Sequence, residues 1–160
     1  MHRHERLPGA PTDRVRGFTL IEIMAVVLII GLLSTIVGVA IFQQVDKGRI
    51  TATRAQISNL EGVLELYRMD NARFPTNEQG LEALARPPAI PPEPRNYPAG
   101  GYLRGGRLPT DPWGEAYQYE SPGQHNTHSY DLWSFGGDGQ PGGEGGDADI
   151  GNWPPEEIGG

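Results

Sequence analysis

The sequence has 160 residues, among them 23 glycines and 15 prolines, which predicts one domain with much loop and turn. The formal net charge is −7, and from residue 111 onward there are ten Asp or Glu residues but no Lys or Arg. We expect no nucleic-acid partner, because such binding needs a basic surface, and the acidic end is either a solvated tail or a cation site. Cysteine is absent, so a small core would need another support, such as a metal or assembly with copies of itself.

The N-terminal part predicts a leader followed by a membrane segment. Residues 1–17 carry four arginines and two acids, and 4 − 2 gives a charge of +2, which favours a cytoplasmic leader. Basic residues soon after the apolar run, at Lys47 and Arg49, weaken that rule. In residues 18–42 the one strongly polar side chain is Glu22. As a helix this segment would be about 37 Å long, enough to cross a hydrocarbon core of about 30 Å, and we predict a transmembrane helix.

Two simpler interpretations of this apolar segment exist. A secretory signal peptide also has a basic start and an apolar run, and Gly38-Val39-Ala40 offers a small-residue cleavage site. A plain uncleaved anchor is the other. Glu22 counts against both, because a carboxylate inside a membrane helix is costly unless it is paired. The residues alone leave these alternatives open.

The residues around Gly17 resemble the leader of type IV pilins and pseudopilins. The matching run is Arg16-Gly17-Phe18-Thr19-Leu20-Ile21-Glu22. The resemblance implies that a prepilin peptidase cuts between Gly17 and Phe18 and that Phe18 is then N-methylated. It also implies that Glu22 pairs with the new α-amine of a neighbouring subunit, so that a charge costly when alone becomes tolerable in the assembly.

The following segment, residues 43–69, predicts an amphipathic continuation of the same helix. It contains no proline, and its apolar residues recur at helical spacing, at Ile50, Ile57, Leu60, Leu64 and Tyr67. A coiled-coil stalk is the alternative, but the stripe is too short for sustained heptads. We therefore predict an α+β fold in which this long helix packs on a small sheet.

Residues 70–160 are predicted to form the globular head. The helix ends near residues 70–75, and a short helix capped by Asn77 is expected over residues 77–85. Residues 87–98 form a proline-rich loop. Alternation over residues 117–119 and 130–132 is typical of strands in a small antiparallel sheet.

An acidic, glycine-rich loop, residues 132–153, is a candidate calcium site. Asp138, Asp147 and Asp149 could supply carboxylates, and the glycines could let backbone carbonyls point inward, which suits calcium. The spacing is not that of an EF-hand, and a single copy of a calcium-binding β-helix repeat could not stack. A flexible acidic tail is the alternative. The aromatic flanks count against it, namely Trp133, Phe135 and Trp153.

Blocks along the head are similar to the major pseudopilin family of the type II secretion system. They comprise residues 66–84, 96–102, 108–114 and 121–124, and one departure is Val39, where many family members have proline. The resemblance implies one structural Ca²⁺, with Asp138, Asp147 and Asp149 as side-chain ligands and the Phe135 carbonyl as a further ligand.

The same resemblance implies a function and a location. The expected function is a homopolymeric helical filament, the periplasmic pseudopilus, that drives export of folded proteins across the outer membrane. The implied partners are minor pseudopilins, the inner-membrane assembly platform, its ATPase and the prepilin peptidase. The implied location is the inner membrane of a Gram-negative bacterium, crossed once, with the head in the periplasm.

The sequence does not predict an enzyme. His125 and His128 lie in a polar turn without a third metal ligand of the right kind, so we expect solvated loop histidines, and no nucleophile motif or phosphate loop is present. A nearer alternative is a type IV pilus subunit for adhesion or DNA uptake, which would commonly carry a C-terminal disulfide loop. A more distant one is a membrane-tethered, calcium-dependent binding or hydrolase domain.

Overall fold

A computed structural model of the chain describes residues 17–154, with the side chains of residues 36–43 outside that description. All of the predicted leader except Gly17 therefore lies outside the described residues. The chain divides into two compact units, one ending at Ile41 and one beginning at Phe42. Each is considered by itself below.

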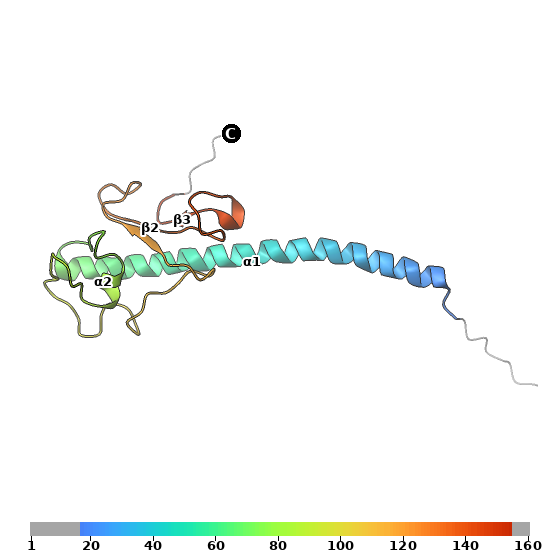
Figure 1. Cartoon of the computed structure of the whole chain (residues 1–160), viewed down its shortest axis with the longest axis horizontal. Helices are drawn as coiled ribbons and strands as arrows, with labels where there is room; N and C mark the ends of the chain where they lie inside the picture. Colours follow the sequence, from blue (N-terminus) through green and yellow to red (C-terminus); the bar gives the residue numbers. More distant parts are fainter. Residues whose placement is uncertain (1–16, 155–160) are drawn as a thin grey trace, which may run out of the picture. The chain divides into compact units, whose positions relative to one another are not determined.

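The dominant element is α1, Leu20–Asn71, a helix of 52 residues (Figure 1). It begins and ends two residues later than predicted, and its backbone stays helical through Val39. After α1, Ala72 takes a positive φ of 61° and donates its N–H to the Arg68 carbonyl at 2.7 Å, a left-handed C-terminal cap. No helix within the described residues is both long and apolar enough for a membrane span, and the last part of the predicted transmembrane segment, residues 36–43, has its side chains outside that description.

The head carries a small antiparallel sheet of three strands in the order β1-β2-β3. These are β1 (Gln118–Glu120), β2 (Asp131–Ser134) and β3 (Ile150–Gly151). Strands β1 and β2 were predicted, and each begins one residue later than predicted. The third was not predicted, because two residues among glycines carry no periodic pattern and only pairing with β2 defines them as a strand.

The core forms where the apolar stripe of α1 meets the head. Ile57, Leu60, Leu64 and Tyr67 are all buried, and Leu132 of β2 belongs to the same cluster. Ile50, the first member of the stripe, is half-buried against it. Full burial of such a side chain contributes about 1.5–3 kcal/mol, so these few residues account for much of the attachment of the helix to the head.

The short helix near residue 80 differs from the prediction. The observed helix is α2, Glu82–Ala85, and the preceding residues form turns instead. Asn77 does not cap it, because its Oδ1 accepts the Ser121 N–H at 2.6 Å. Gln79 donates its side-chain amide to the carbonyls of Ile90 and Pro92 at 3.0 and 2.9 Å, which fastens the proline-rich loop to this turn.

Candidate functional site

The predicted cleavage position is open in the structure. Phe18 is 84% exposed, and among the described residues no atom other than those of Gly17 and its chain neighbours lies within 4 Å of where a side chain on Gly17 would begin. Both residues precede α1, in irregular backbone. A bond in irregular, exposed chain can enter an enzyme's active site without prior unfolding.

Glu22 has a local role that the sequence analysis missed. Its Oε2 accepts the backbone N–H of Thr19 at 2.7 Å and the Thr19 hydroxyl at 2.9 Å. In return, the Glu22 N–H donates to Thr19 Oγ1 at 3.3 Å. This is a capping box, and the spacing Thr-x-x-Glu at the start of an apolar run is a sequence signal that could have revealed it. In the single chain, the Glu22 carboxylate thus has partners of its own.

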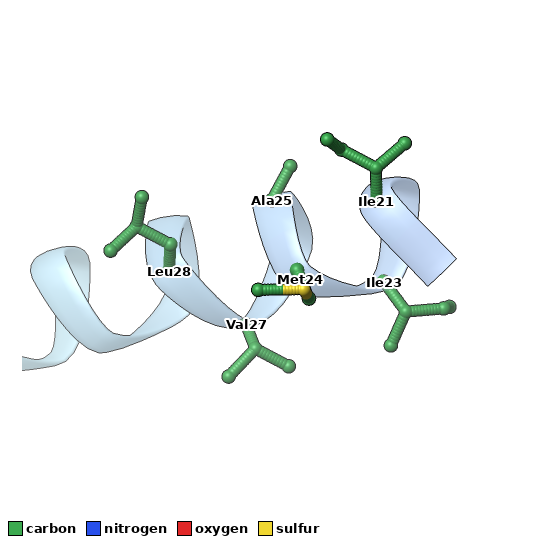
Figure 2. Close-up of a pocket in the computed structure, with 6 residues that line it drawn as sticks. All are labelled: Ile21, Ile23, Met24, Ala25, Val27 and Leu28. Carbon is green, nitrogen blue, oxygen red and sulfur yellow. The ribbon is translucent and has the colours of Figure 1, made fainter. Parts of the chain in front are cut away.

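The first turns of α1 expose apolar side chains on all sides. Figure 2 shows Ile21, Ile23, Met24 and their neighbours projecting in different directions from a single helix. Most of the large apolar residues between Phe18 and Leu33 are at least half exposed. So much contiguous apolar surface indicates contact with other apolar matter, whether lipid or protein.

The predicted calcium ligands lie in the glycine-rich loop, where each carboxylate has its own surroundings. No group of three or more His, Cys, Asp or Glu side chains within residues 17–154 is arranged to hold a metal ion. Asp138 caps its own turn, with Oδ1 accepting the Gln140 N–H at 3.0 Å. Asp147 closes η1, Gly145–Asp147. A fourth acid that the sequence analysis missed, Asp46 of α1, lies directly against Gly146.

Asp149 holds an oxygen atom without a partner. Its Oδ2 accepts the Gly142 N–H at 3.0 Å, whereas its Oδ1 is buried and makes no hydrogen bond to any of residues 17–154. Leaving a buried carboxylate oxygen unsatisfied costs roughly 1–3 kcal/mol or more, and such atoms are rare in folded proteins. A bound cation is one group that would satisfy it.

The glycines of the loop allow oxygen atoms to approach closely. A side chain on Gly137 would begin only 2.6 Å from Asp147 Oδ1. One on Gly136, where φ is +72°, would begin 2.7 Å from the Ala148 carbonyl oxygen and 3.0 Å from that of Asp147. Carboxylate and carbonyl oxygens are the donors that calcium prefers, so the chemistry of this segment fits that ion.

A second cluster surrounds Asp131, which is 2% exposed. Its carboxylate accepts the N–H groups of Gln124, His125 and Asn126 at 2.8–2.9 Å, and also the Asn126 side-chain amide. Burial by itself would raise the pKa of Asp131, but the hydrogen bonds from His125 and Asn126 outweigh it and hold the pKa below its ordinary value.

His125 is exposed, as expected of a solvated loop histidine, but its ring also makes two specific contacts. Its Nδ1 lies 3.1 Å from Asp131 Oδ2, and its ring stacks on Trp153 at 3.9 Å with an interplanar angle of 4°. The buried carboxylate fixes the imidazole in this place, which sequence spacing could not reveal. His128 is exposed, as His125 is, but no contact of this kind is recorded for it within residues 17–154.

Comparison with known proteins gives two family matches. The prokaryotic N-terminal methylation motif matches residues 12–38. The model of type II secretion system protein G matches residues 40–153, more than half of the chain.

Individual relatives agree. The type II secretion system core protein G of Pectobacterium carotovorum is 49% identical over 145 residues, 91% of this chain and 88% of that protein. The core protein G of Vibrio cholerae is 49% identical over 142 residues, which cover 89% of this chain and 94% of that protein. A crystal structure of the major pseudopilin from the type 2 secretion system of enterohaemorrhagic Escherichia coli matches with TM-score 0.60 and 47% identity, covering 69% of this chain and 90% of that one.

A long helix that starts at an N-methylation motif and packs on a small antiparallel sheet defines a pilin-like structural subunit. The chain belongs to the type II secretion system protein G family, the family of the major pseudopilin. The predicted α+β pilin-like fold and the pseudopilin function are thereby confirmed, as is the expectation of a structural subunit in place of an enzyme.

Proposed function

We propose that this chain polymerises into the periplasmic pseudopilus of the type II secretion system and so drives export of folded proteins across the outer membrane. The observation that carries the proposal is the exposed apolar start of α1 within the N-terminal methylation motif, on a chain of the protein G family. Identical subunits joined by a heterologous contact that does not close form an open helical filament. Bundling of the segment 18–42 in the filament centre would cover the apolar side chains.

Processing prepares the chain for this assembly. The prepilin peptidase cuts between Gly17 and Phe18 and methylates the new amine of Phe18, which stays protonatable. The Glu22 carboxylate then exchanges its hydrogen bonds to Thr19 for the amine of a neighbouring subunit. The exchange is favourable because a charge-assisted contact between two ions replaces contacts to a neutral residue.

Before assembly, the subunit is anchored by residues 18–42 in the inner membrane of a Gram-negative bacterium, with its head in the periplasm. Apolar side chains on every side of the helix suit a lipid environment as well as a filament core. The assembly platform, powered by its ATPase, extracts the subunit, and minor pseudopilins complete the filament.

The acidic loop holds one structural Ca²⁺. Asp138, Asp147 and Asp149 provide carboxylates and Phe135 provides its carbonyl. When bound, the ion neutralises a loop that has no basic residue of its own and cross-links its two ends. The unsatisfied Oδ1 of Asp149 and the close oxygen atoms around Gly136 support this assignment.

Mass spectrometry of the chain purified from cells that carry the secretion system tests the proposal. The expected mature chain begins at Phe18 with one added methyl group and sediments as filament. A chain that begins at Ile41, or that keeps Met1, would overturn it.

A further inference from the structure

We propose that Asp111 and Ser134 are positioning residues of the calcium site, where they aim the Phe135 carbonyl at the ion without touching it. The inference rests on the proposed function, because it specifies how the chain holds the proposed Ca²⁺. It is carried by a series of buried hydrogen bonds that ends on the peptide group between Phe135 and Gly136.

The hydrogen bonds join β2 to the turn of residues 111–115. Ser134, the last residue of β2, is fully buried. Its hydroxyl donates to Asp111 Oδ2 at 2.5 Å and accepts the Gly136 N–H at 3.2 Å. A serine hydroxyl has one hydrogen atom to donate, so donation to Asp111 leaves the lone pairs of Oγ for Gly136. Ser134 therefore links the Asp111 carboxylate to the start of the glycine-rich loop.

The Asp111 carboxylate is itself held in place. Asp111 is 5% exposed, and its Oδ1 accepts the N–H groups of Trp113 and Glu115 at 3.1 and 2.8 Å. The Asp111 N–H donates to the Glu115 carbonyl at 2.9 Å, which closes the turn. The same turn lies against the loop, because a side chain on Gly137 would begin 3.1 Å from Trp113 Nε1. Both carboxylate oxygens thus have partners, and the position from which Oδ2 accepts is fixed.

A fixed Gly136 N–H also fixes the Phe135 carbonyl. The two groups belong to one planar trans peptide, in which the N–H and the C=O point in opposite directions. The hydrogen bond to Ser134 therefore turns the Phe135 carbonyl oxygen away from Ser134. Within residues 17–154, no backbone N–H outside the helices and strands donates to this carbonyl, so the oxygen is open to a cation.

Such an arrangement raises metal affinity through the ligand. A carbonyl that already has its orientation loses little freedom when the ion binds. Removal of a group that hydrogen-bonds to and orients a metal ligand typically weakens binding roughly 10–100-fold. Asp111 and Ser134 act on the Phe135 carbonyl in this way, one peptide group away from the ion.

Calcium titration of the full-length chain in detergent tests the two residues. Ser134→Ala removes the link and should weaken Ca²⁺ binding about tenfold in isothermal titration calorimetry. In Asp111→Asn, Oδ1 still accepts two backbone N–H groups, so the amide nitrogen replaces Oδ2 and cannot accept from Ser134. This variant should also weaken binding about tenfold. If Asp111→Asn fails to fold, the Ser134 variants decide.

Two further variants separate positioning from general damage. Ser134→Thr keeps the hydroxyl and should bind Ca²⁺ within about threefold of the unaltered chain. Ser129→Ala is the matched control, because Ser129 lies in the turn before β2, where its backbone bonds to Gly123 and Asn126. It should change the Ca²⁺ affinity less than about twofold.

The Ca²⁺ affinity is the deciding measurement. A merely structural role of Ser134 would lower the melting temperature in excess chelator but leave the Ca²⁺ affinity of the folded chain unchanged. If Ser134→Ala binds Ca²⁺ as tightly as the Ser129→Ala control, the positioning role is refuted while the calcium site stands. If the unaltered chain binds no Ca²⁺, the proposed calcium site fails, and this inference fails with it.

Discussion

At the scale of single residues, Glu22 has two possible sets of partners. These are Thr19 of its own chain and, in the proposed filament, the amine of a neighbouring subunit. In the isolated chain Glu22 caps α1 through Thr19, an arrangement that stabilises the first turn of the helix. Glutamine can accept the same hydrogen bonds but carries no charge. The two roles of Glu22 can therefore be separated by substitution.

We predict that Glu22→Gln is cut and methylated normally but assembles poorly, because the neutral amide cannot pair with a neighbour's amine. Mass spectrometry reports the processing, and sedimentation of filaments reports assembly. As a control, Thr19→Val removes the threonine hydroxyl and keeps the charge, and it should still assemble. Normal filaments from Glu22→Gln would contradict the charge-pairing model.

Asp131 is a buried acid whose carboxylate holds the loop of residues 124–126 by hydrogen bonds. The pKa of Asp131 is lower in the folded chain than in the unfolded chain, so the unfolded chain binds the proton more readily. The contribution of Asp131 to the unfolding free energy is therefore complete above a pH of about 4 and is lost as the pH falls through the folded pKa. Asp131→Asn should cost about 3 kcal/mol of unfolding free energy at pH 7 and flatten the acid dependence below pH of about 4.

Urea unfolding of a fragment that begins at Phe42, followed from neutral to acid pH, measures this effect. Glu115→Gln is the control, since that carboxylate is exposed. Parallel pH profiles for Asp131→Asn and the unaltered fragment would show that Asp131 is not the group responsible.

At the scale of elements, the second half of α1 is held by one face. Leu64 is fully buried on that face, whereas Leu66, half a turn away, is 53% exposed. We predict that Leu64→Ala costs about 3 kcal/mol of unfolding free energy and Leu66→Ala about 0.5. Equal losses in urea unfolding would mean that the helix does not pack on the sheet through this stripe.

At the scale of the whole molecule, the acidic loop closes the head without any cysteine. If one Ca²⁺ binds there, an ion present at about 100 times its Kd contributes about 2.7 kcal/mol. Chelation should then lower the melting temperature of the fragment beginning at Phe42 by about 10 °C. Differential scanning calorimetry with and without chelator checks this, and an unchanged melting temperature in excess chelator would refute the calcium site.

Asp149→Asn is the matched variant for that experiment. It should melt low both with and without chelator, because the ligand itself is altered. A variant that still responds fully to chelator would place the ion elsewhere in the chain.

The sequence by itself determined the features that depend on local pattern. The helical spacing from Ile50 to Tyr67 identified α1 and its buried face, because one helical period places those side chains on one side whatever they pack against. The leader and the run around Gly17 identified the class, because a processing enzyme acts on a short linear motif. The same local reasoning could have found the Thr19–Glu22 capping box.

Only the tertiary structure decided which polar groups meet across long stretches of chain. Asn77 bonds to Ser121, 44 residues away, instead of capping a helix, and β3 exists because its backbone pairs with β2. His125, Asp131 and Trp153 gather only after the sheet and its loops have closed around them. Such contacts depend on where the backbone returns in space, and no short-range pattern of residues encodes that position.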